Sequence, residues 1–189
     1  VGSTKSGIVA AIKNHPKRNR YVAFHPMWGT ENSGPKSAQK ESFSGRAAVI
    51  CDKEDSAEDA FSLVEKVAKT LEMNTIFMAS EAHDVHTAYI SHISHITSYA
   101  LANTVLEKER EEDTIFQLAS SGFSSTVRLA KSHPEMWVPI FKQNKENVLD
   151  VLNEHITQLR KFKAALEKEN YELLEELIRN ANKIRGILK

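Results

Sequence analysis

The sequence predicts an α/β layer over residues 1–80, followed by an all-helical part over residues 81–189. Two observations carry this prediction. In the first part, short apolar runs alternate with helix-patterned stretches, which is typical of a sheet covered by helices. From Glu81 onward the apolar spacing is helical throughout, and it ends in two long amphipathic stretches. The two parts are therefore expected to be separate domains.

The composition is that of a globular chain without a polyanionic partner. Of the 189 residues, 41% are hydrophobic, which is enough to build a sizeable core. The 25 Lys and Arg residues balance 25 Asp and Glu residues, so the positive charge typical of nucleic-acid or membrane-surface binders is missing. One cysteine cannot form an internal disulfide, and no apolar run is long enough to cross a bilayer. We expect a cytoplasmic protein with a small molecule or another protein as its partner.

The first predicted elements alternate strand and helix. Residues 1–3 are expected to be the end of a buried strand, so that the chain begins within an element. Ser3 is a candidate helix cap, and apolar residues at helical spacing run from Ile8 to a stop at Pro16. Residues 21–24 are expected to form the next strand.

Two further strands enclose a helix. Residues 47–51 and 75–78 are short apolar strand candidates. Between them, Ser56 with Asp59 three residues later resembles a capping box. The helix that this box opens carries an apolar face made of Ala60, Leu63, Val64, Val67 and Leu71.

The helical part is expected to begin with a long helix from Glu81 to about Glu107. Its apolar residues cover more than one stripe, as in a helix at the centre of a bundle. Shorter helices are expected over residues 114–119, 123–131 and 134–141.

Two amphipathic helices are expected at the end of the chain. Their apolar residues recur at spacings of three and four, from Leu149 to Leu166 and from Leu174 to Leu188. Such spacing is typical of a coiled-coil-like seam, which needs a partner helix. The periodicity alone leaves two alternatives open, packing within one bundle or a dimer interface.

One histidine is a candidate proton acceptor. His25 ends a short apolar run in the segment HPMWGTE over residues 25–31. A histidine delivered by a strand end into a turn can accept a proton near neutral pH. Glu31 lies close enough along the chain to position a group beside it.

Four of the eight histidines fall within the long predicted helix, namely His83, His86, His92 and His95. His92 and His95 share a helix face and could hold a metal. No accompanying cluster of Cys or carboxylate residues supports a metal site, so none is predicted. Hydrogen bonds to neighbouring groups are the alternative for most of these histidines, and recognition of an anion is favoured for His95.

Arg128 is a candidate ligand for a carboxylate because its guanidinium is planar and offers paired donors. Solvation, or pairing with a surface glutamate, is the alternative. Neither a G-x-G-x-x-G sequence nor a phosphate loop occurs in the chain, so it lacks the usual dinucleotide fingerprint. Cys51 is expected to be a packed thiol within an apolar strand.

Taken together, four segments resemble the prephenate dehydrogenase family in order and spacing. They are GSTK over residues 2–5, HPMWGTENSG over 25–34, HD at 83–84 with SHISH over 91–95, and GF at 122–123 through Arg128 to Trp137. The resemblance covers essentially the whole chain. What that family has before the GSTK segment, a Gly-rich nucleotide-binding start, has no counterpart in this sequence.

The resemblance implies a domain organisation. Residues 1–80 would be the C-terminal part of a Rossmann-like nucleotide-binding domain, and residues 81–189 a helical domain for dimerisation and substrate binding. A homodimer is therefore expected. Because the Gly-rich start is missing, the resemblance also implies that the polypeptide as given is inactive by itself.

The resemblance further implies an activity, the oxidative decarboxylation of prephenate to 4-hydroxyphenylpyruvate in tyrosine biosynthesis, with hydride transfer to NAD or NADP. His25 would be the base that accepts the proton of the ring hydroxyl. Ser3 would hydrogen-bond the same hydroxyl, hold His25 in register and touch the nicotinamide end of the cofactor. The residue that distinguishes NAD from NADP belongs to the segment that this sequence lacks.

The remaining site residues follow from the same resemblance. Arg128 would grip a substrate carboxylate, and His95 would bind the pyruvyl end. Glu31 would pair with the arginine at the pocket mouth and gate entry, and Trp137 would form a pocket wall. The pair at residues 83–84 would have a structural or orienting role.

The sequence leaves two alternatives to prephenate dehydrogenase open. Arogenate dehydrogenase acts on a substrate that differs by an amino group on the side chain. A non-catalytic helical dimer that at most binds prephenate, or tyrosine as an inhibitor, is an alternative of another class. Trp28 stands where many relatives of the family have a small residue, which would reshape the turn after His25.

Overall fold

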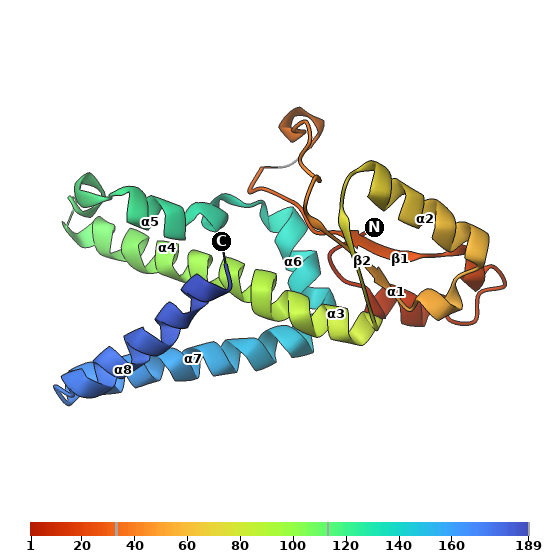
Figure 1. The fold of residues 1–189 in the computed structure, drawn as a ribbon. Helices are drawn as coiled ribbons and strands as arrows, with labels where there is room; N and C mark the ends of the chain where they lie inside the picture. The colour runs from red at the N-terminus through yellow and green to blue at the C-terminus, as the bar shows by residue number, and fades with distance from the viewer. Residues whose placement is uncertain (33, 113, 189) are drawn as a thin grey trace. The chain divides into compact units, whose positions relative to one another are not determined.

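The computed structural model describes residues 1–32, 34–112 and 114–188. The chain forms two compact units, Val1–Val148 and Leu149–Lys189. Within the first unit, a three-stranded sheet with helices is followed along the chain by helices alone (Figure 1). The predicted fold class, an α/β layer followed by an all-helical part, is confirmed.

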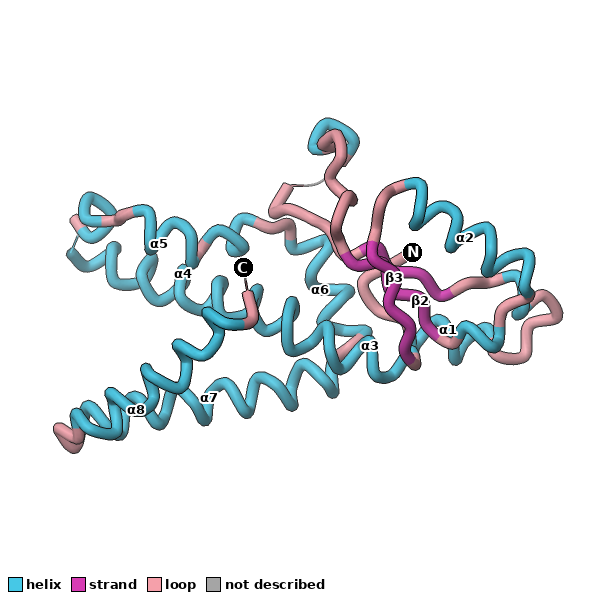
Figure 2. The backbone as a smooth tube through the Cα atoms, in the orientation of Figure 1, coloured by secondary structure: helices cyan, strands magenta, loops and turns pink. Residues whose placement is uncertain are grey.

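The sheet contains β1 (Ala23–Pro26), β2 (Ala47–Cys51) and β3 (Asn74–Met78) in that order (Figure 2). β1 runs antiparallel to β2 and places His25 opposite Val49. β3 runs parallel to β2. His25 therefore lies one residue before the end of the first strand, where the chain leaves the sheet.

The start of the chain differs from the prediction in two places. The strand predicted over residues 21–24 begins two residues later, because the Tyr21 N–H closes a tight turn on the Arg18 carbonyl at 3.0 Å. Residues 1–3 form no strand, and the first side chain is 86% exposed. The predicted strand end is therefore wrong in this structure.

Helices α1 (Ser6–Ile12) and α2 (Glu58–Thr70) cover opposite faces of the sheet (Figure 1). Side chains alternate between the two faces of a strand, so each helix meets every second residue of β2. The core under α2 contains Phe24, Ala48, Ile50, Phe61, Ala68 and Met73. The core under α1 contains Ala23, Val49 and Cys51, with Val9 packed against them.

The cap of α1 comes from a distant residue. The predicted cap, Ser3, is not at the helix start; Lys5 is the N-cap, and its side chain makes no capping bond. Instead, the Asp84 carboxylate accepts hydrogen bonds from the backbone N–H groups of Lys5 at 2.8 Å and Ser6 at 2.9 Å. These are the donors that a helix start leaves without partners, and a carboxylate there is also favoured by the helix dipole.

The predicted capping box of α2 is wrong. Ala57 is the N-cap, and no side chain caps the helix. The Ser56 hydroxyl instead donates to the Tyr21 carbonyl at 3.2 Å, and the Asp59 carboxylate pairs with Arg20. Both side chains thus tie α2 to the segment before β1.

The predicted long helix is confirmed, with one irregularity. It contains α3 (Ser80–Thr87), a π-helical segment η4 (Ala88–His92) and α4 (Ile93–Glu112). The π-helical segment widens the helix by one residue in the middle, and such segments are frequent at functional sites. The shorter elements that follow are η5 (Ile115–Leu118), α5 (Ser121–Thr126), η6 (Arg128–Lys131) and α6 (Pro134–Gln143).

The second unit contains most of α7 (Lys145–Glu167) and all of α8 (Tyr171–Asn182). The predicted pair of amphipathic helices at the chain end is therefore confirmed. Asn170 caps α8 by accepting the Leu173 N–H at 3.0 Å. Large apolar side chains stay exposed along this unit: Leu149, Leu159, Leu166, Tyr171, Leu173, Ile178, Ile184, Ile187 and Leu188.

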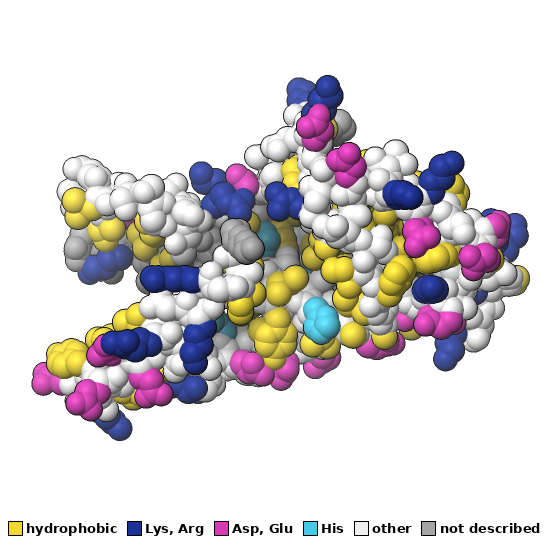
Figure 3. Space-filling model, in the orientation of Figure 1, with side chains coloured by type: hydrophobic (Ala, Val, Ile, Leu, Met, Phe, Trp, Pro, Cys, Tyr) yellow, Lys and Arg dark blue, Asp and Glu magenta, His cyan; other side chains and the backbone are white. Residues whose placement is uncertain are grey.

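The surface carries both signs of charge. On the face drawn in Figure 3, basic and acidic side chains are interspersed over the sheet-containing part. None of the helices in the described part of the chain has the length and apolar character needed to cross a membrane. The remaining short helical turns are η1 (Arg18–Arg20), η2 (Pro35–Ser37), η3 (Lys53–Asp55) and η7 (Lys183–Gly186).

Candidate active site

A cavity of about 530 Å³ within the first unit collects most of the predicted site residues. His25 and Ser3 line it from the sheet-containing segment, and His95 and Trp137 line it from the helices. Segments far apart in sequence therefore meet at one place. The roles predicted for these residues stay predictions, but their proximity is a property of the structure.

The π-helical segment shapes the helical wall of this cavity. Ser91 and His92 of this segment line it, together with Thr87 before the segment and His95 after it. Positions 91, 92 and 95 share one face even in a regular helix, as the sequence predicted for His92 and His95. Nothing in the amino-acid pattern signals a π-helical turn, so the irregularity itself could not be predicted.

A chain of hydrogen bonds runs from His25 to a buried carboxylate. The Nδ1 atom of His25 lies 2.8 Å from Nε2 of His83, and Nδ1 of His83 lies 2.8 Å from an oxygen of Asp84. His83 and Asp84 are each only 1% exposed. His83 is thus one hydrogen bond from His25 and Asp84 is two, and the orienting role that the resemblance implied stays a prediction.

Asp84 is the fixed end of this chain. Burial alone would raise its pKa, but hydrogen bonds from His83, Ser6 and Lys5 outweigh burial, and the pKa lies below its usual value. The side chain is therefore an ionised carboxylate, which only accepts hydrogen bonds. It receives the Ser6 hydroxyl at 2.5 Å in addition to the two backbone N–H groups at the start of α1.

The carboxylate determines where the ring protons lie. Because Asp84 only accepts, the hydrogen of neutral His83 must be on Nδ1, and its Nε2 is bare. That bare nitrogen accepts the hydrogen on Nδ1 of His25. Nε2 of His25 is then the unprotonated nitrogen, and it has no partner among the described residues. His25 can take up a proton at this atom.

Burial keeps His25 neutral in the absence of a bound anion. Its pKa is lowered to about 3, first because burial penalises the charged ring and next because the Lys5 ammonium and His83 lie nearby. A neutral ring at pH 7 is the form that can act as a base.

Lys5 was not predicted as a site residue, although it is 1% exposed and lies beside His25. Its ammonium donates to the carbonyls of Gly2 and, at 3.2 Å, Thr4. Because Gly2 and Thr4 flank Ser3 in the chain, these two bonds fix the backbone on both sides of Ser3. Desolvation lowers the pKa of Lys5. No sequence signal separates this buried lysine from the solvated ones.

Ser3 lies in the cavity without a side-chain partner among the described residues. His25 is held by His83 rather than by Ser3. The serine hydroxyl is thus free for a bound molecule, and its predicted bond to a substrate hydroxyl stays a prediction.

His95 is held by stacking and by one backbone bond. Its ring lies on Trp137 with centroids 3.4 Å apart and planes at 27°. Its Nδ1 lies 3.0 Å from the Ser91 carbonyl, which can only accept, so Nδ1 carries the hydrogen and Nε2 is bare. Burial lowers the pKa of His95. Trp137 is itself 6% exposed and forms a wall of the cavity.

Glu31 and Arg128 form an ion pair beside the cavity. A guanidinium nitrogen of Arg128 lies 2.6 Å from a carboxylate oxygen of Glu31. Neither residue lines the cavity, but their chain neighbours Thr30 and Leu129 do. The pKa of Glu31 is lowered by a backbone hydrogen bond and then by Arg128. The contact that the resemblance implied is present, and its gating role stays a prediction.

Trp28 also lines the cavity, and its ring meets Phe43 edge to face, with centroids 5.9 Å apart. The large ring is thus accommodated by packing on the loop between β1 and β2. Two apolar residues of α6, Met136 and Ile140, also line the cavity and were not predicted. Their spacing of four beside Trp137 fits one face of a helix, which is the signal that could have identified them.

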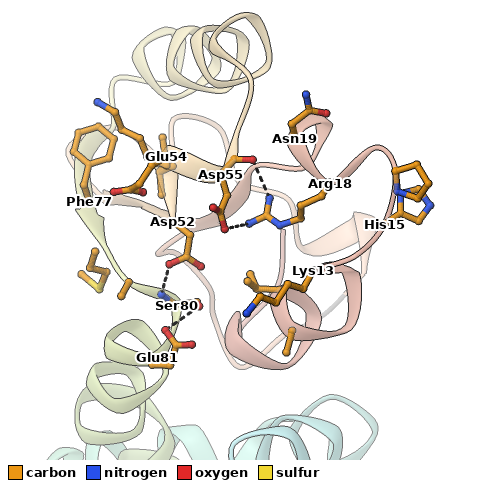
Figure 4. A pocket seen from close by; sticks show the side chains of 17 residues that line it. Lys13, His15, Arg18, Asn19, Asp52, Glu54, Asp55, Phe77, Ser80 and Glu81 are labelled. Carbon is orange, nitrogen blue, oxygen red and sulfur yellow. Dashed lines mark hydrogen bonds and ion pairs between the residues drawn. The ribbon is translucent and has the colours of Figure 1, made fainter.

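Two other possible sites are less suited to catalysis. Among the described residues, no group of three or more His, Cys, Asp or Glu side chains is placed to hold a metal ion. A larger cavity of about 980 Å³ lies near the ends of β2 and β3 (Figure 4). Arg18 pairs with Asp55 at 2.9 Å, and one oxygen of Asp52 accepts the Ser80 N–H at 3.0 Å, whereas the other Asp52 oxygen is buried without a partner among the described residues. None of the predicted site residues lines it.

The buried histidines predict a loss of stability in acid. The pKa values of His25 and His92 are lowered to about 3 and about 4, mainly by burial. An unfolded histidine titrates near pH 6.5, so below that pH the unfolded chain binds more protons than the folded one. Between about pH 6.5 and 4.5, the free energy of unfolding should fall by up to about 1.4 kcal/mol per pH unit for each of these histidines.

Urea denaturation between pH 7.5 and 4.5 measures this dependence. The variant His92→Gln removes one of the titrating rings and should give a shallower slope, whereas His86→Gln replaces an exposed ring and should leave the slope unchanged. A free energy of unfolding that stays constant over this pH range would contradict burial of neutral histidines.

Family models match the chain over nearly its whole length. Residues 79–180 match "Prephenate dehydrogenase, dimerization domain", and residues 1–77 match "Prephenate dehydrogenase, nucleotide-binding domain". The boundary between the two models lies close to the end of β3.

Two curated relatives and one solved structure agree with the family models. A prephenate dehydrogenase of Bacillus subtilis is 30% identical over 186 residues, which are 98% of this chain and 50% of the relative. A cyclohexadienyl dehydrogenase of Zymomonas mobilis is 26% identical over 189 residues, 100% of this chain and 64% of the relative. The crystal structure of Aquifex aeolicus prephenate dehydrogenase with hydroxyphenyl propionate and NAD⁺ has a TM-score of 0.89 at 28% identity, covering 100% of this chain and 65% of that one. The chain thus spans from half to about two thirds of the length of these proteins.

Proposed function

Because the chain belongs to the prephenate dehydrogenase family, we propose that the protein containing it oxidises and decarboxylates prephenate to 4-hydroxyphenylpyruvate, with hydride transfer to a nicotinamide cofactor. The observation that carries this proposal is the bare Nε2 of His25, directed by a buried carboxylate through a second histidine. An alcohol oxidation needs a base at the hydroxyl that loses its proton. The cavity offers that base together with a free serine hydroxyl.

The residues of this chain fit one end of a nicotinamide cofactor. Ser3, whose hydroxyl is unpartnered in the described structure, lies in the cavity with His25, where the reacting ring would meet the substrate. A phosphate-binding Gly-rich loop, the usual site for the phosphates of a dinucleotide, is not in this sequence. The chemistry that a bound nicotinamide supplies is the acceptance of a hydride. NAD is supported by the relative crystallised with NAD⁺, and NADP stays an alternative.

His25 acts at the ring hydroxyl of the substrate. Its Nε2 takes the hydroxyl proton as the hydride leaves the same ring carbon, which becomes a carbonyl carbon. The carbon–carbon bond to the ring carboxylate then breaks and carbon dioxide leaves. The electron pair of that bond makes the ring aromatic and places negative charge on the ring oxygen, which takes the proton back from His25. The positive charge that His25 acquires is stabilised through His83 by Asp84, because Nδ1–H of His25 still donates to His83. Ser3 donates to the reacting oxygen and orients it.

The remaining roles concern the two carboxylates of the substrate. We assign Arg128 to one of them, and we assign the gating of the cavity to Glu31, its ion-pair partner. His95 contacts the pyruvyl end, and Trp137 forms the wall on which His95 is stacked. The same cavity would admit tyrosine as an inhibitor, since tyrosine shares the ring and the side-chain carboxylate of the product.

The domain organisation and assembly are part of the proposal. Residues 1–80 belong to the nucleotide-binding domain and residues 81–189 to the helical domain, in line with the family models that match residues 1–77 and 79–180. The helical domain forms a homodimer, which is supported by the name of its family model and by the exposed apolar side chains of α7 and α8. A cytoplasmic location agrees with the single reduced cysteine.

Turnover of the full-length protein tests this function. Prephenate with NAD should yield 4-hydroxyphenylpyruvate, carbon dioxide and reduced cofactor in equal amounts. Arogenate and NADP are measured in parallel. A higher kcat/KM on arogenate would make arogenate, not prephenate, the substrate of the same type of reaction. Ligand binding without turnover of either substrate would favour the non-catalytic alternative.

A further inference from the structure

Three histidines line the cavity, and their ring protons are not equivalent. His25 and His95 each carry the hydrogen on Nδ1 and present a bare Nε2. Both are therefore hydrogen-bond acceptors toward the cavity when neutral. The pyruvyl end of the proposed substrate consists of a ketone and a carboxylate, which are acceptors as well. A donor on the helical wall of the cavity would complement these acceptors.

His92 is oriented by a neighbouring amide. The side-chain nitrogen of Asn144 lies 2.7 Å from the backbone carbonyl of Asp84 and 3.2 Å from Nδ1 of His92. A carbonyl only accepts, so the atom at 2.7 Å must be the amide nitrogen, and this removes the usual ambiguity of an asparagine side chain. Its second hydrogen then points to His92, whose Nδ1 must be bare.

The proton of neutral His92 therefore lies on Nε2. This nitrogen has no hydrogen-bond partner among the described residues. It is not among the fully buried atoms that lack a partner, so part of its surface is accessible. His92 lines the cavity, so Nε2 meets the cavity. The ring is only 1% exposed and is packed edge to face against Trp137 and Phe141, with interplanar angles of 79° and 78°. Packing and the Asn144 bond thus fix both the plane of the ring and its direction.

We propose that His92 binds the substrate by donating a hydrogen bond from Nε2 to an oxygen of its pyruvyl end, and that Asn144 is the residue that makes His92 a donor. The inference rests on the proposed function and deepens it by assigning the hydrogen-bond donor at the pyruvyl end, which neutral His95, with its bare Nε2, cannot be. Burial lowers the pKa of His92 to about 4, so the ring stays a neutral donor at physiological pH.

Asp84 links the two hydrogen-bond networks. Its carboxylate orients His25 through His83, and its backbone carbonyl orients His92 through Asn144. The two histidines are consequently set in opposite tautomers from one residue of α3. A substitution of the Asp84 side chain therefore alters the network of His25, but it keeps the backbone carbonyl that orients Asn144 and His92.

The tautomers are measured directly on the 189-residue chain, without cofactor or activity. Long-range ¹H–¹⁵N spectra separate protonated from bare ring nitrogens, and the signals of His92 and His95 are assigned from their loss in His92→Gln and His95→Gln. We expect the hydrogen of His92 on Nε2 and that of His95 on Nδ1. A hydrogen on Nδ1 of His92 would overturn the inference, whatever the function of the protein.

Ligand binding tests the contact itself, with hydroxyphenyl propionate as the probe. Replacement of His92 by leucine should weaken binding by about tenfold or more, as expected for the loss of a donor to a charged oxygen. Replacement by glutamine keeps an amide N–H near the position of Nε2 and should retain binding to within about threefold. Equal binding by the leucine variant and the unmodified chain would overturn the inference.

Asn144→Asp gives an independent test of the orienting residue. A carboxylate in place of the amide accepts from Nδ1, so it should move the hydrogen of His92 from Nε2 to Nδ1 and weaken probe binding by about tenfold. Retention of the Nε2 hydrogen in this variant would overturn the role of Asn144. If the unmodified full-length protein does not bind the probe, the proposed function is contradicted, while the spectra still decide the tautomer of His92.

Discussion

Replacement of His25 by asparagine in the full-length protein is expected to lower kcat by about 10²–10⁴-fold with little change in KM, the usual contribution of general-base catalysis. Asparagine keeps an N–H that can donate to Nε2 of His83, so the buried network is preserved. It has no nitrogen at the position of Nε2, so the proton acceptor is lost. Steady-state kinetics with prephenate and NAD measure both constants.

The exposed His86 lies on the same helix as His83 and provides the control. His86→Asn should retain kcat and KM to within about twofold, as surface changes away from a site usually do. A kcat for His25→Asn that stays within a few-fold of the unmodified protein would remove His25 as the base.

Replacement of Asp84 by asparagine is expected to have the second-largest effect. Four donors converge on this carboxylate, from the backbone of Lys5 and Ser6, the Ser6 hydroxyl and the His83 ring. An amide offers only one oxygen, so in either orientation one N–H faces another donor. We expect kcat to fall by about 10²-fold, because His83 and His25 lose the charge that fixes their tautomers. The free energy of unfolding should also fall, by about 1–3 kcal/mol.

The pH profile separates this role from a purely structural one. The Asp84 charge raises the pKa of His25, so its removal should lower that pKa and move the acid limb of the kcat profile to lower pH. Asp59→Asn removes an exposed carboxylate of α2 and should leave the profile unchanged. A loss of stability in Asp84→Asn without any shift of the acid limb would limit Asp84 to capping α1.

Local pattern was sufficient for most elements of the fold. Residues 47–51 are continuously apolar, as expected of a central strand covered on both faces, and β2 has these bounds. The pattern was less informative at β1, because Tyr21 and Val22 fit an apolar run equally well but precede the first ladder pair, Ala23 with Cys51. The direction of β1 against β2 is a tertiary property that no local pattern determines.

The site was predictable where a residue type implies its chemistry. The histidine at a strand end could be identified from the sequence by its chemistry, whereas the pairing of Arg128 with Glu31 was implied only by the family resemblance. The long-range contacts were not predictable: Asp84 caps a helix that begins 78 residues earlier, and Asn144 orients a histidine 52 residues away. Ser3 and Ser56 were predicted as caps because serine favours that position. Asp84 takes the role predicted for Ser3, whereas no side chain caps α2 and Ser56 donates to the Tyr21 carbonyl.

The central claim is that Asp84 and His83 act on the substrate proton only through His25, which accepts it. A double variant tests this claim most directly. If Asp84 acts through His25, the variant that combines Asp84→Asn with His25→Asn should have the same kcat as His25→Asn alone, because the carboxylate has no remaining base to support. A kcat reduced by the product of the two single losses would contradict the claim and show that the two residues act independently.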